Sequence, residues 1–176
     1  MSLFHKASCA LCALTLTTAP LAAKMPDKAV ASAPIFTADG RDAGYAVITT
    51  RKDKARLRIS LTGLPPGEHG MHFHAVGSCK GDGFSGAGGH LNPYAKMHGS
   101  KNAGGSHMGD LPNIMVDANG LALTDIGLEG LSPELIQAMF DKDGASIVIH
   151  AGADDYMTDP SGNSGGRIAC GVFKHR

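Results

Sequence analysis

The stretch "ARLRISLTGLPPGEHGMHFHAV", residues 55–76, determines the fold class more than any other part of the chain. In its first half, apolar side chains alternate with arginine or serine at Leu57, Ile59 and Leu61. This alternation predicts a half-buried β-strand. The turn-rich "PPGEHG" follows, and "GMHFHAV" then resumes a strand pattern. Two short strands joined by a turn are typical of an antiparallel sheet.

Similar short segments recur along the whole chain. Strands are expected in "APIFTA" and "GYAVITT" on either side of the turn "DGRDA", in "NIMVDANGLALTDI" with a hairpin around Asn119-Gly120, and in "ASIVIHA" and "GRIACGVF". The segment "SPELIQAMF" is the helical candidate, with Ser132 as N-cap and Pro133 at the first helical position. The pattern therefore predicts an all-β, antiparallel domain with eight short strands, one short helix and two long loops.

Length and composition limit the class of protein. The 176 residues suffice for one domain with a substantial core. Glycine is abundant, with 24 residues, and basic and acidic side chains balance at 16 each. No basic stripe is present, and nucleic acid is therefore not an expected partner.

The first two dozen residues have the layout of a secretory signal peptide. Lys6 precedes an apolar run from about Ala7 to Thr18, and small residues precede Lys24. The run is too short for a membrane-spanning helix, and the alternative is a short apolar helix packed on the domain. We expect a signal peptide over residues 1–23, a mobile segment over 24–34 and the folded domain over 35–176. Export to a periplasm or outside the cell follows, without a membrane anchor.

Removal of the presequence leaves Cys79 and Cys170. In an oxidising compartment, two cysteines far apart in sequence most simply form a disulfide. Two free buried thiols are the alternative.

Histidine is concentrated where the strand pattern fails. Six of the nine histidines lie between His72 and His150. His72 and His74 point to the same face of their strand because side chains alternate. His69, three residues before His72, points to the other face and is interpreted as structural. From Gly77 to about Asp110 there is almost no hydrophobic periodicity, and a loop of this length is usually functional.

This loop supplies three imidazoles and a carboxylate, a complete tetrahedral set of zinc ligands, at His90, His98, His107 and Asp110. Their separations suit a segment wrapped around an ion, although a solvated loop that is His-rich by chance is the alternative. His150 ends an apolar strand and by itself would be read as an edge or core histidine.

Together these motifs resemble the copper/zinc superoxide dismutases of the exported bacterial type. The matching segments occur in the family's order and cover about Ile35 to Phe173: "HGMHFH", "GGHLNP", "MHG", "HMGDLP", "VIHAGADD" and "GGRIACGV". The resemblance implies a Greek-key β-barrel or sandwich and superoxide as substrate. It also allows a homodimer, since the family is often dimeric although some bacterial members are monomers.

The resemblance further implies a role for each matching residue. One copper ion per chain would be bound by His72, His74, His90 and His150, and one zinc ion by His90, His98, His107 and Asp110. His90 would bridge the two ions as an imidazolate. Asp154 would link one copper histidine to one zinc histidine, Arg167 would receive the anion beside copper, and Cys79 and Cys170 would form the family's disulfide. Otherwise, Asp154 would be an exposed loop carboxylate and Arg167 an ordinary arginine at a strand entry.

Two features bear on the catalytic interpretation. An all-imidazole site with an open position binds copper in both oxidation states and admits a small anion. However, the segment from Asp154 to Gly166 contains three aspartates and no Lys or Arg, and the cationic guidance that some family members place there is therefore missing.

Superoxide dismutation is the expected function, and an exported copper/zinc buffer on the same fold is the alternative. A binuclear hydrolase is disfavoured because a carboxylate-rich site and a placed general base are lacking.

Overall fold

The structure is a computed structural model that describes residues 28–51, 54–128 and 132–176. The expected signal peptide lies outside the described residues. Ten strands are described: β1 (Lys28–Thr37), β2 (Asp42–Arg51), β3 (Lys54–Leu61), β4 (Gly67–His69), β5 (Met71–His74), β6 (Ile114–Val116), β7 (Ala122–Gly127), β8 (Ser146–His150), β9 (Arg167–Val172) and β10 (Lys174–His175). A 3₁₀ segment η1 (Asp82–Ala87) and the helix α1 (Ser132–Met139) complete the described elements.

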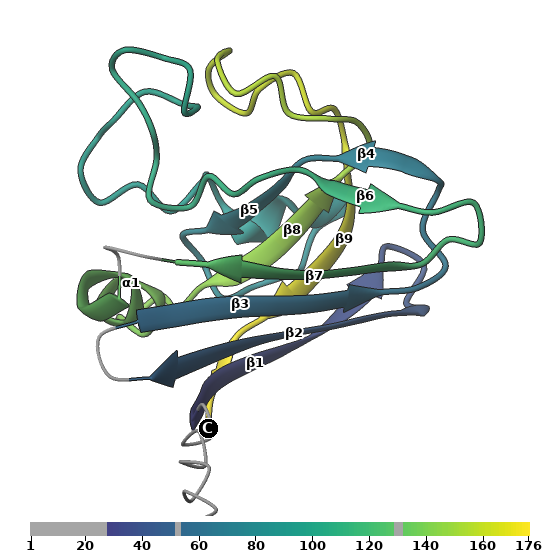
Figure 1. Cartoon of the computed structure of the whole chain (residues 1–176), viewed down its shortest axis with the longest axis horizontal. Helices are drawn as coiled ribbons and strands as arrows, with labels where there is room; N and C mark the ends of the chain where they lie inside the picture. Colours follow the sequence, from purple (N-terminus) through teal and green to yellow (C-terminus); the bar gives the residue numbers. More distant parts are fainter. Residues whose placement is uncertain (1–27, 52–53, 129–131) are drawn as a thin grey trace, which may run out of the picture.

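The strands form one large antiparallel sheet and one small one. The large sheet has the order β5-β8-β9-β1-β2-β3-β7, with β10 paired to β1, and β4 pairs with β6. Figure 1 shows the large sheet curled into a half-barrel, with the β4–β6 pair across one end. The all-β prediction is confirmed, whereas the Greek-key connection order stays a prediction.

The alternating strand pattern predicted for residues 55–61 is confirmed. Ala55, Leu57, Ile59 and Leu61 are buried, and Arg56 and Arg58 point outward. The apolar residues join a core that includes Phe73, Ile147 and Ile149 from the other part of the sheet. This burial of apolar surface from both parts of the curled sheet drives closure.

Three local predictions differ from the structure. Residues 67–69 of the predicted turn form β4, and residues 28–34, assigned to a mobile segment, lie in β1 and pair with β2. The turn at Asn119-Gly120 forms, with Asp117 Oδ1 accepting the Asn119 N–H at 2.8 Å. Its flanking strands do not form the expected hairpin ladder, because β6 pairs with β4 and β7 with β3.

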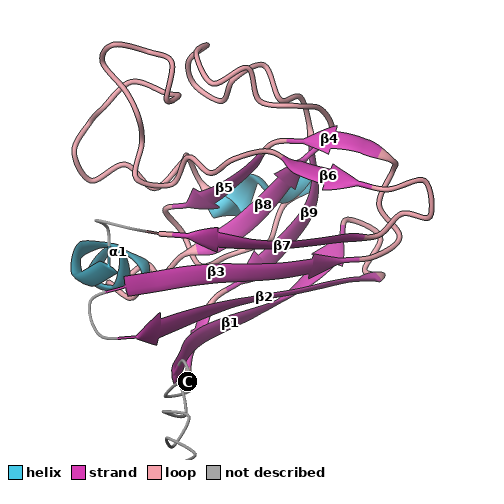
Figure 2. Cartoon of the chain, in the orientation of Figure 1, coloured by secondary structure: helices cyan, strands magenta, loops and turns pink. Residues whose placement is uncertain are grey.

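Two long segments without strands lie over the same end of the half-barrel. Figure 2 shows these pink loops, residues 88–113 and 151–166, above the β4–β6 pair. They contact each other, since the Lys101 N–H donates to the Tyr156 carbonyl at 2.9 Å. Among the described residues, no helix is long and apolar enough to cross a membrane.

Candidate metal centre

Strands β5 and β8 bring three of the predicted histidines together. β5 pairs with β8 in a register that places His72 opposite Val148. His72 and His74 are fully buried, and their ring centroids lie 6.4 Å apart on one face, as predicted. His150 ends β8, and its ring centroid lies 4.8 Å from that of His72.

The long loop brings the remaining histidines to the same place. His90 pairs with His74 through an isolated antiparallel bridge, and its ring stacks on His72 with centroids 3.9 Å apart. The rings of His98 and His107 lie 5.2 and 5.3 Å from that of His90. His90 therefore belongs to two groups of side chains. The first group contains His72, His74, His90 and His150, and the second contains His90, His98, His107 and Asp110.

The first group has four nitrogens without a hydrogen-bond partner. These buried atoms are His72 Nδ1, His74 Nε2, His90 Nε2 and His150 Nε2. The four residues offer ligand atoms within 4.8 Å of one another. Because a buried polar atom without a partner costs free energy, four that converge fit a metal ion.

Hydrogen bonds on the outer side of two of these rings, His74 and His150, fix their tautomers. His74 Nδ1 donates to the Gly88 carbonyl and His150 Nδ1 to the Gly165 carbonyl, each at 3.0 Å. A neutral imidazole has one N–H, so donation at one nitrogen leaves a lone pair on the other. The outer partners thus aim the lone pairs of both rings inward.

The second group converges on one carboxylate oxygen. Asp110 Oδ1 lies 2.9 Å from His90 Nδ1 and 3.1 Å from the Nδ1 atoms of His98 and His107. The His98 contact lacks hydrogen-bond geometry, and this nitrogen has no hydrogen-bond partner. Three nitrogens and one oxygen fit a tetrahedral zinc site. Ligand atoms of His72, His90, His98 and Asp110 also lie within 4.8 Å of one another. We assign His72 to the first group because its Nδ1 has no hydrogen-bond partner, like the Nε2 atoms of the other three histidines in that group.

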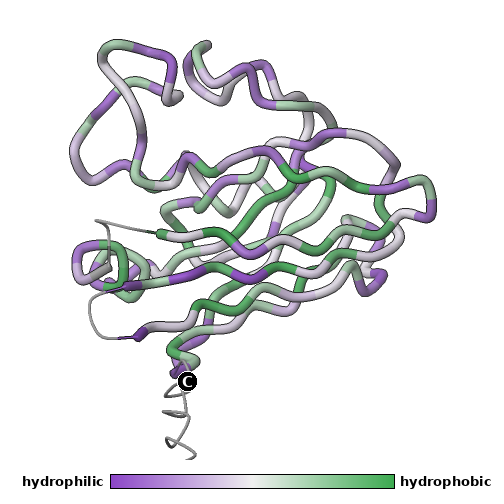
Figure 3. Tube along the Cα trace, in the orientation of Figure 1, coloured by the Kyte–Doolittle hydropathy of each residue, from purple (hydrophilic) through white to green (hydrophobic). Residues whose placement is uncertain are grey.

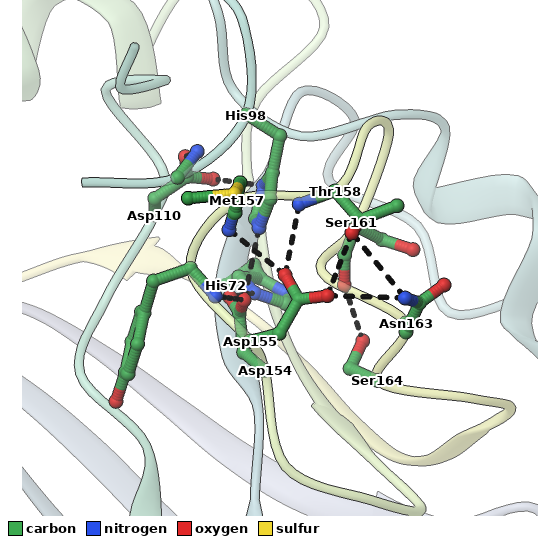
Figure 4. A network of polar contacts seen from close by, with 12 residues as sticks. His72, His98, Asp110, Asp154, Asp155, Met157, Thr158, Ser161, Asn163 and Ser164 are labelled. Atoms are coloured by element: carbon green, nitrogen blue, oxygen red, sulfur yellow. Dashed lines mark hydrogen bonds and ion pairs between the residues drawn. The ribbon is translucent and has the colours of Figure 1, made fainter. Parts of the chain in front are cut away.

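Asp154 joins the two groups from outside. Its Oδ2 accepts from His72 Nε2 at 2.7 Å, and its Oδ1 accepts from His98 Nε2 at 3.0 Å. Figure 4 shows this fully buried carboxylate between the two rings. The Asp154 backbone N–H is held by the Asn113 side chain at 2.9 Å. Asp154 therefore orients one ring of each group.

Burial keeps the four imidazoles of the first group neutral, and hydrogen bonds keep the two carboxylates Asp110 and Asp154 ionised. Burial lowers the pKa of His72 to about 4 and that of His74 to about 2, and it also lowers the pKa of His90 and His150. Burial alone would raise the pKa values of Asp110 and Asp154, but the hydrogen bonds that they accept bring both to about 2. At neutral pH these four imidazoles and two carboxylates thus have the protonation state that metal ligands need.

Arg167 lies at the start of β9 beside the first group. Its guanidinium donates to the carbonyls of Phe84 at 2.8 Å and Gly88 at 2.7 Å. Gly88 also holds His74, so the guanidinium and this ring share one acceptor. Burial lowers the pKa of Arg167, yet an arginine keeps its charge in proteins.

The predicted disulfide is present. Cys79 and Cys170 are bonded, with 5.8 Å between their Cα atoms and a sequence separation of 91. The bond joins the segment before η1 to the strand that carries Arg167.

His69 is structural, as predicted, rather than part of either donor set. It is buried, with Nδ1 2.7 Å from the His150 carbonyl and Nε2 2.8 Å from the Pro65 carbonyl. Lys80 and Lys96 are exposed, and Lys101 Nζ lies 5.0 Å from the centroid of the Tyr156 ring.

Sequence reasoning missed several groups that position the ligands. Asp159 Oδ1 accepts the His98 backbone N–H at 2.7 Å, and Asp110 Oδ2 accepts those of Gly99 and His107 at 2.8 and 3.0 Å. The sequence shows Asp159 only as one of several aspartates in a loop, and no spacing rule singles it out. Backbone acceptors such as Gly88 and Gly165 leave no signal in side-chain chemistry.

The fold and the site define a class: a metalloprotein with two adjacent donor sets that share one imidazole on an antiparallel β half-barrel. The model of the family described as copper/zinc superoxide dismutase (SODC) matches residues 43–173. The superoxide dismutase [Cu-Zn] of Caulobacter vibrioides is 41% identical over 82% of this chain and 85% of its own. The chain belongs to the copper/zinc superoxide dismutase family, and its cofactors are copper and zinc.

Solved structures agree with this assignment. The copper/zinc superoxide dismutase of Brucella abortus superposes with a TM-score of 0.66 at 30% identity, covering 80% of this chain and 97% of that one. A SOD-like protein from Bacillus subtilis gives a TM-score of 0.74 at 37% identity, covering 80% and 96%.

Proposed function

We propose that the first donor set binds copper and the second binds zinc. Copper would take His72 Nδ1 and the Nε2 atoms of His74, His90 and His150. Zinc would take Asp110 Oδ1 and the Nδ1 atoms of His90, His98 and His107. The observation that carries this proposal is a set of buried ring nitrogens without a hydrogen-bond partner. In His72, His74 and His150, the opposite nitrogen of the same ring is hydrogen-bonded on its outer side. The all-imidazole set suits a redox-active ion, and the carboxylate-containing set suits zinc.

The reaction is the dismutation of superoxide, in which two superoxide anions and two protons give dioxygen and hydrogen peroxide. Copper, held by the first donor set, would supply the one-electron oxidation and reduction of superoxide. The residues of the chain supply position, charge and a proton.

His90 is the proposed proton carrier. It offers Nε2 to the first set and Nδ1 to the second, so as an imidazolate it would hold both ions. Its Nε2 would take up one of the two protons that the reaction consumes and pass it to the peroxide product. Its Nδ1 would hold zinc, which would keep the ring in place.

Arg167 is the proposed docking group for the anion. Its two carbonyl hydrogen bonds fix the guanidinium beside the His74 ring, and its positive charge attracts superoxide at short range. A non-catalytic copper/zinc buffer would need no such cation, so Arg167 favours the enzyme over this alternative.

We infer that the protein acts after export to a periplasm or outside the cell, once residues 1–23 are removed. The disulfide supports this location, because such bonds persist in oxidising compartments. A homodimer stays a prediction from the family, to be checked by sedimentation.

Reconstitution tests the metal assignment. Metal-free protein supplied with both ions should bind one copper and one zinc per chain, measured by elemental analysis. Superoxide loss should require added copper. Absence of bound zinc after reconstitution would contradict the two-set assignment, and full metal content without superoxide loss would favour the buffer.

A further inference from the structure

Positive charge is concentrated on the outer face of the sheet formed by β2, β3 and β7. Residues 51–58 read "RKDKARLR" and contain five basic side chains and one acidic one, although the whole chain is balanced. Lys54, Arg56 and Arg58 are exposed and alternate with buried apolar residues. Figure 3 shows this alternation of hydrophilic and hydrophobic residues along β3. Because alternate residues lie about 7 Å apart along a strand, the three cations form a straight row.

One acidic side chain faces this row from β7. Asp125 lies opposite Arg58, and its carboxylate oxygens lie 2.7 Å from Arg56 Nε and 2.8 Å from an Arg58 terminal nitrogen. Hydrogen bonds from both arginines hold the pKa of Asp125 below its usual range, so it stays ionised. Among the described residues, the four basic side chains Arg51, Lys54, Arg56 and Arg58 and the acidic Asp125 leave a net charge of +3.

Large apolar side chains lie directly beside the cations. Tyr45 and Leu123 are 50% and 74% exposed, and both lie opposite Ser60, on either side of β3. A shallow groove of about 430 Å³ is lined by Tyr45, Val47, Thr49, Arg56, Arg58 and Asp125. We call this surface, made of Arg51, Lys54, Arg56 and Arg58 with Tyr45, Leu123 and Asp125, the cationic face.

We propose that the cationic face binds the surface of a lipid bilayer that carries anionic headgroups. The net charge complements such a surface, and each Lys or Arg near it strengthens binding about fivefold. Exposed Tyr and Leu beside the cations favour a bilayer over a soluble polyanion, because they can enter the boundary between headgroups and acyl chains. Binding would be peripheral and reversible, with no anchor.

The position of the cationic face leaves the metal centre accessible. Figure 1 shows β2 and β3 displaced from the loops of residues 88–113 and 151–166, which enclose the donor sets. A protein held by this face would therefore still receive superoxide from solution. None of the residues of the two donor sets lies on the cationic face.

Vesicle co-sedimentation tests the proposal. Metal-loaded protein with an N-terminus defined by mass spectrometry should bind phosphatidylcholine vesicles that contain phosphatidylglycerol, and bind pure phosphatidylcholine far more weakly. Arg51→Gln with Lys54→Gln, which spares the contacts of Asp125, should weaken binding roughly 20-fold. Arg41→Gln with Lys142→Gln is the matched control: it removes the same charge elsewhere on the surface and should bind like the wild type.

Leu123→Gln separates a bilayer from a soluble polyanion. It should weaken vesicle binding several-fold while leaving retention on a dextran sulfate column unchanged. All variants should keep the wild-type melting temperature and superoxide activity. Equal binding to neutral and anionic vesicles, or equal loss in the charge variant and its control, would overturn the proposal. Wild-type vesicle binding by Leu123→Gln would also overturn it and would indicate a soluble polyanion.

Discussion

At the scale of single residues, Asp110 organises the second donor set in two ways. Its Oδ1 faces three imidazoles, and its Oδ2 accepts the backbone N–H groups of Gly99 and His107. One side chain thus closes the loop and completes the proposed zinc site.

Asp110→Ala should therefore remove zinc before it removes copper. Zinc affinity should fall more than about 100-fold, since even loss of a group behind a ligand costs 10- to 100-fold. Copper should stay, because its four nitrogens are untouched. Metal analysis and hydrogen exchange in residues 81–109 measure the two effects. Asp143→Ala, at an exposed carboxylate elsewhere, is the control; equal loss of both metals in the Asp110 variant would contradict the assignment.

Gly162 controls the bridge made by Asp154. A Cβ at Gly162 would lie 1.8 Å from Asp154 Oδ1 and 2.8 Å from His98 Nε2, and φ is +64°. Gly162→Ala should displace the carboxylate and lower the affinity for both ions about 10- to 100-fold. Gly166→Ala, where a Cβ meets nothing within 4 Å, is the matched control. Chelator competition measures both affinities, and unchanged values in Gly162→Ala would show that the Asp154 bridge does not tune the site.

At the scale of elements, the loops depend on cross-links more than on hydrophobic burial. η1 contributes Phe84 and Ala87 to a small cluster with Val148 and the disulfide residue Cys170. The carbonyls of Phe84 and Gly88 hold Arg167. The disulfide therefore fixes the segment that orients the anion-docking cation.

Replacing Cys79 and Cys170 together by Ser should destabilise the metal-free protein by up to about 4–5 kcal/mol, the entropy estimate for a loop of this length. Urea unfolding with the metals removed measures this, because bound ions would add their own stabilisation. Mass spectrometry of alkylated wild-type protein should find no free thiol at these positions. Two free thiols, or an unchanged unfolding midpoint in the variant, would contradict the structural role.

Elements were predictable from sequence where periodicity was strong, and not where pairing decides the outcome. The alternation in residues 55–61 and the apolar run of β8 indicated their strands directly. The three-residue strands β4 and β6 exist because they pair with each other, and neither has a pattern of its own. The four candidate zinc ligands were predictable because imidazole and carboxylate chemistry is visible in the sequence. His150 was assigned only through the family resemblance, and the backbone carbonyls that aim the rings were not predictable.

At the scale of the whole molecule, balanced charge conceals strong local differences. Equal totals of 16 led to the interpretation that no basic stripe exists, but the fold lines up cations along β3. The loop of residues 154–166 has the opposite bias, with Asp155 and Asp159 beside the metal centre. The hydrogen bond from Thr158 and neighbouring backbone N–H groups lower the pKa of Asp155 to about 2, so it is ionised at neutral pH.

The loop of residues 154–166 therefore supplies no cation that could attract superoxide. A cationic funnel can raise the capture rate of a charged substrate about 10- to 1,000-fold, and superoxide dismutases are themselves an established example. Here Arg167 is the candidate for attraction at short range, and Lys80, Lys96 and Lys101 are the candidates for attraction at long range. Lys101 lies against the acidic loop, with Nζ 3.5 Å from the Asp155 carbonyl.

Arg167→Ala should lower the rate of superoxide dismutation about 10-fold or more while copper and zinc content stay unchanged. Arg167→Lys should recover part of the loss, because lysine keeps the charge but lacks the planar guanidinium. Neutralising the three lysines to Gln should lower the rate further and flatten its dependence on ionic strength, because salt screens exposed charges beyond about 10 Å at 0.1 M. Pulse radiolysis across a salt series measures both rates. The double variant Arg51→Gln with Lys54→Gln removes charge from the cationic face instead, and its rate should keep the wild-type dependence on ionic strength. If the triple lysine variant also keeps the wild-type rate and slope, long-range attraction does not come from these lysines, and capture depends on Arg167 alone.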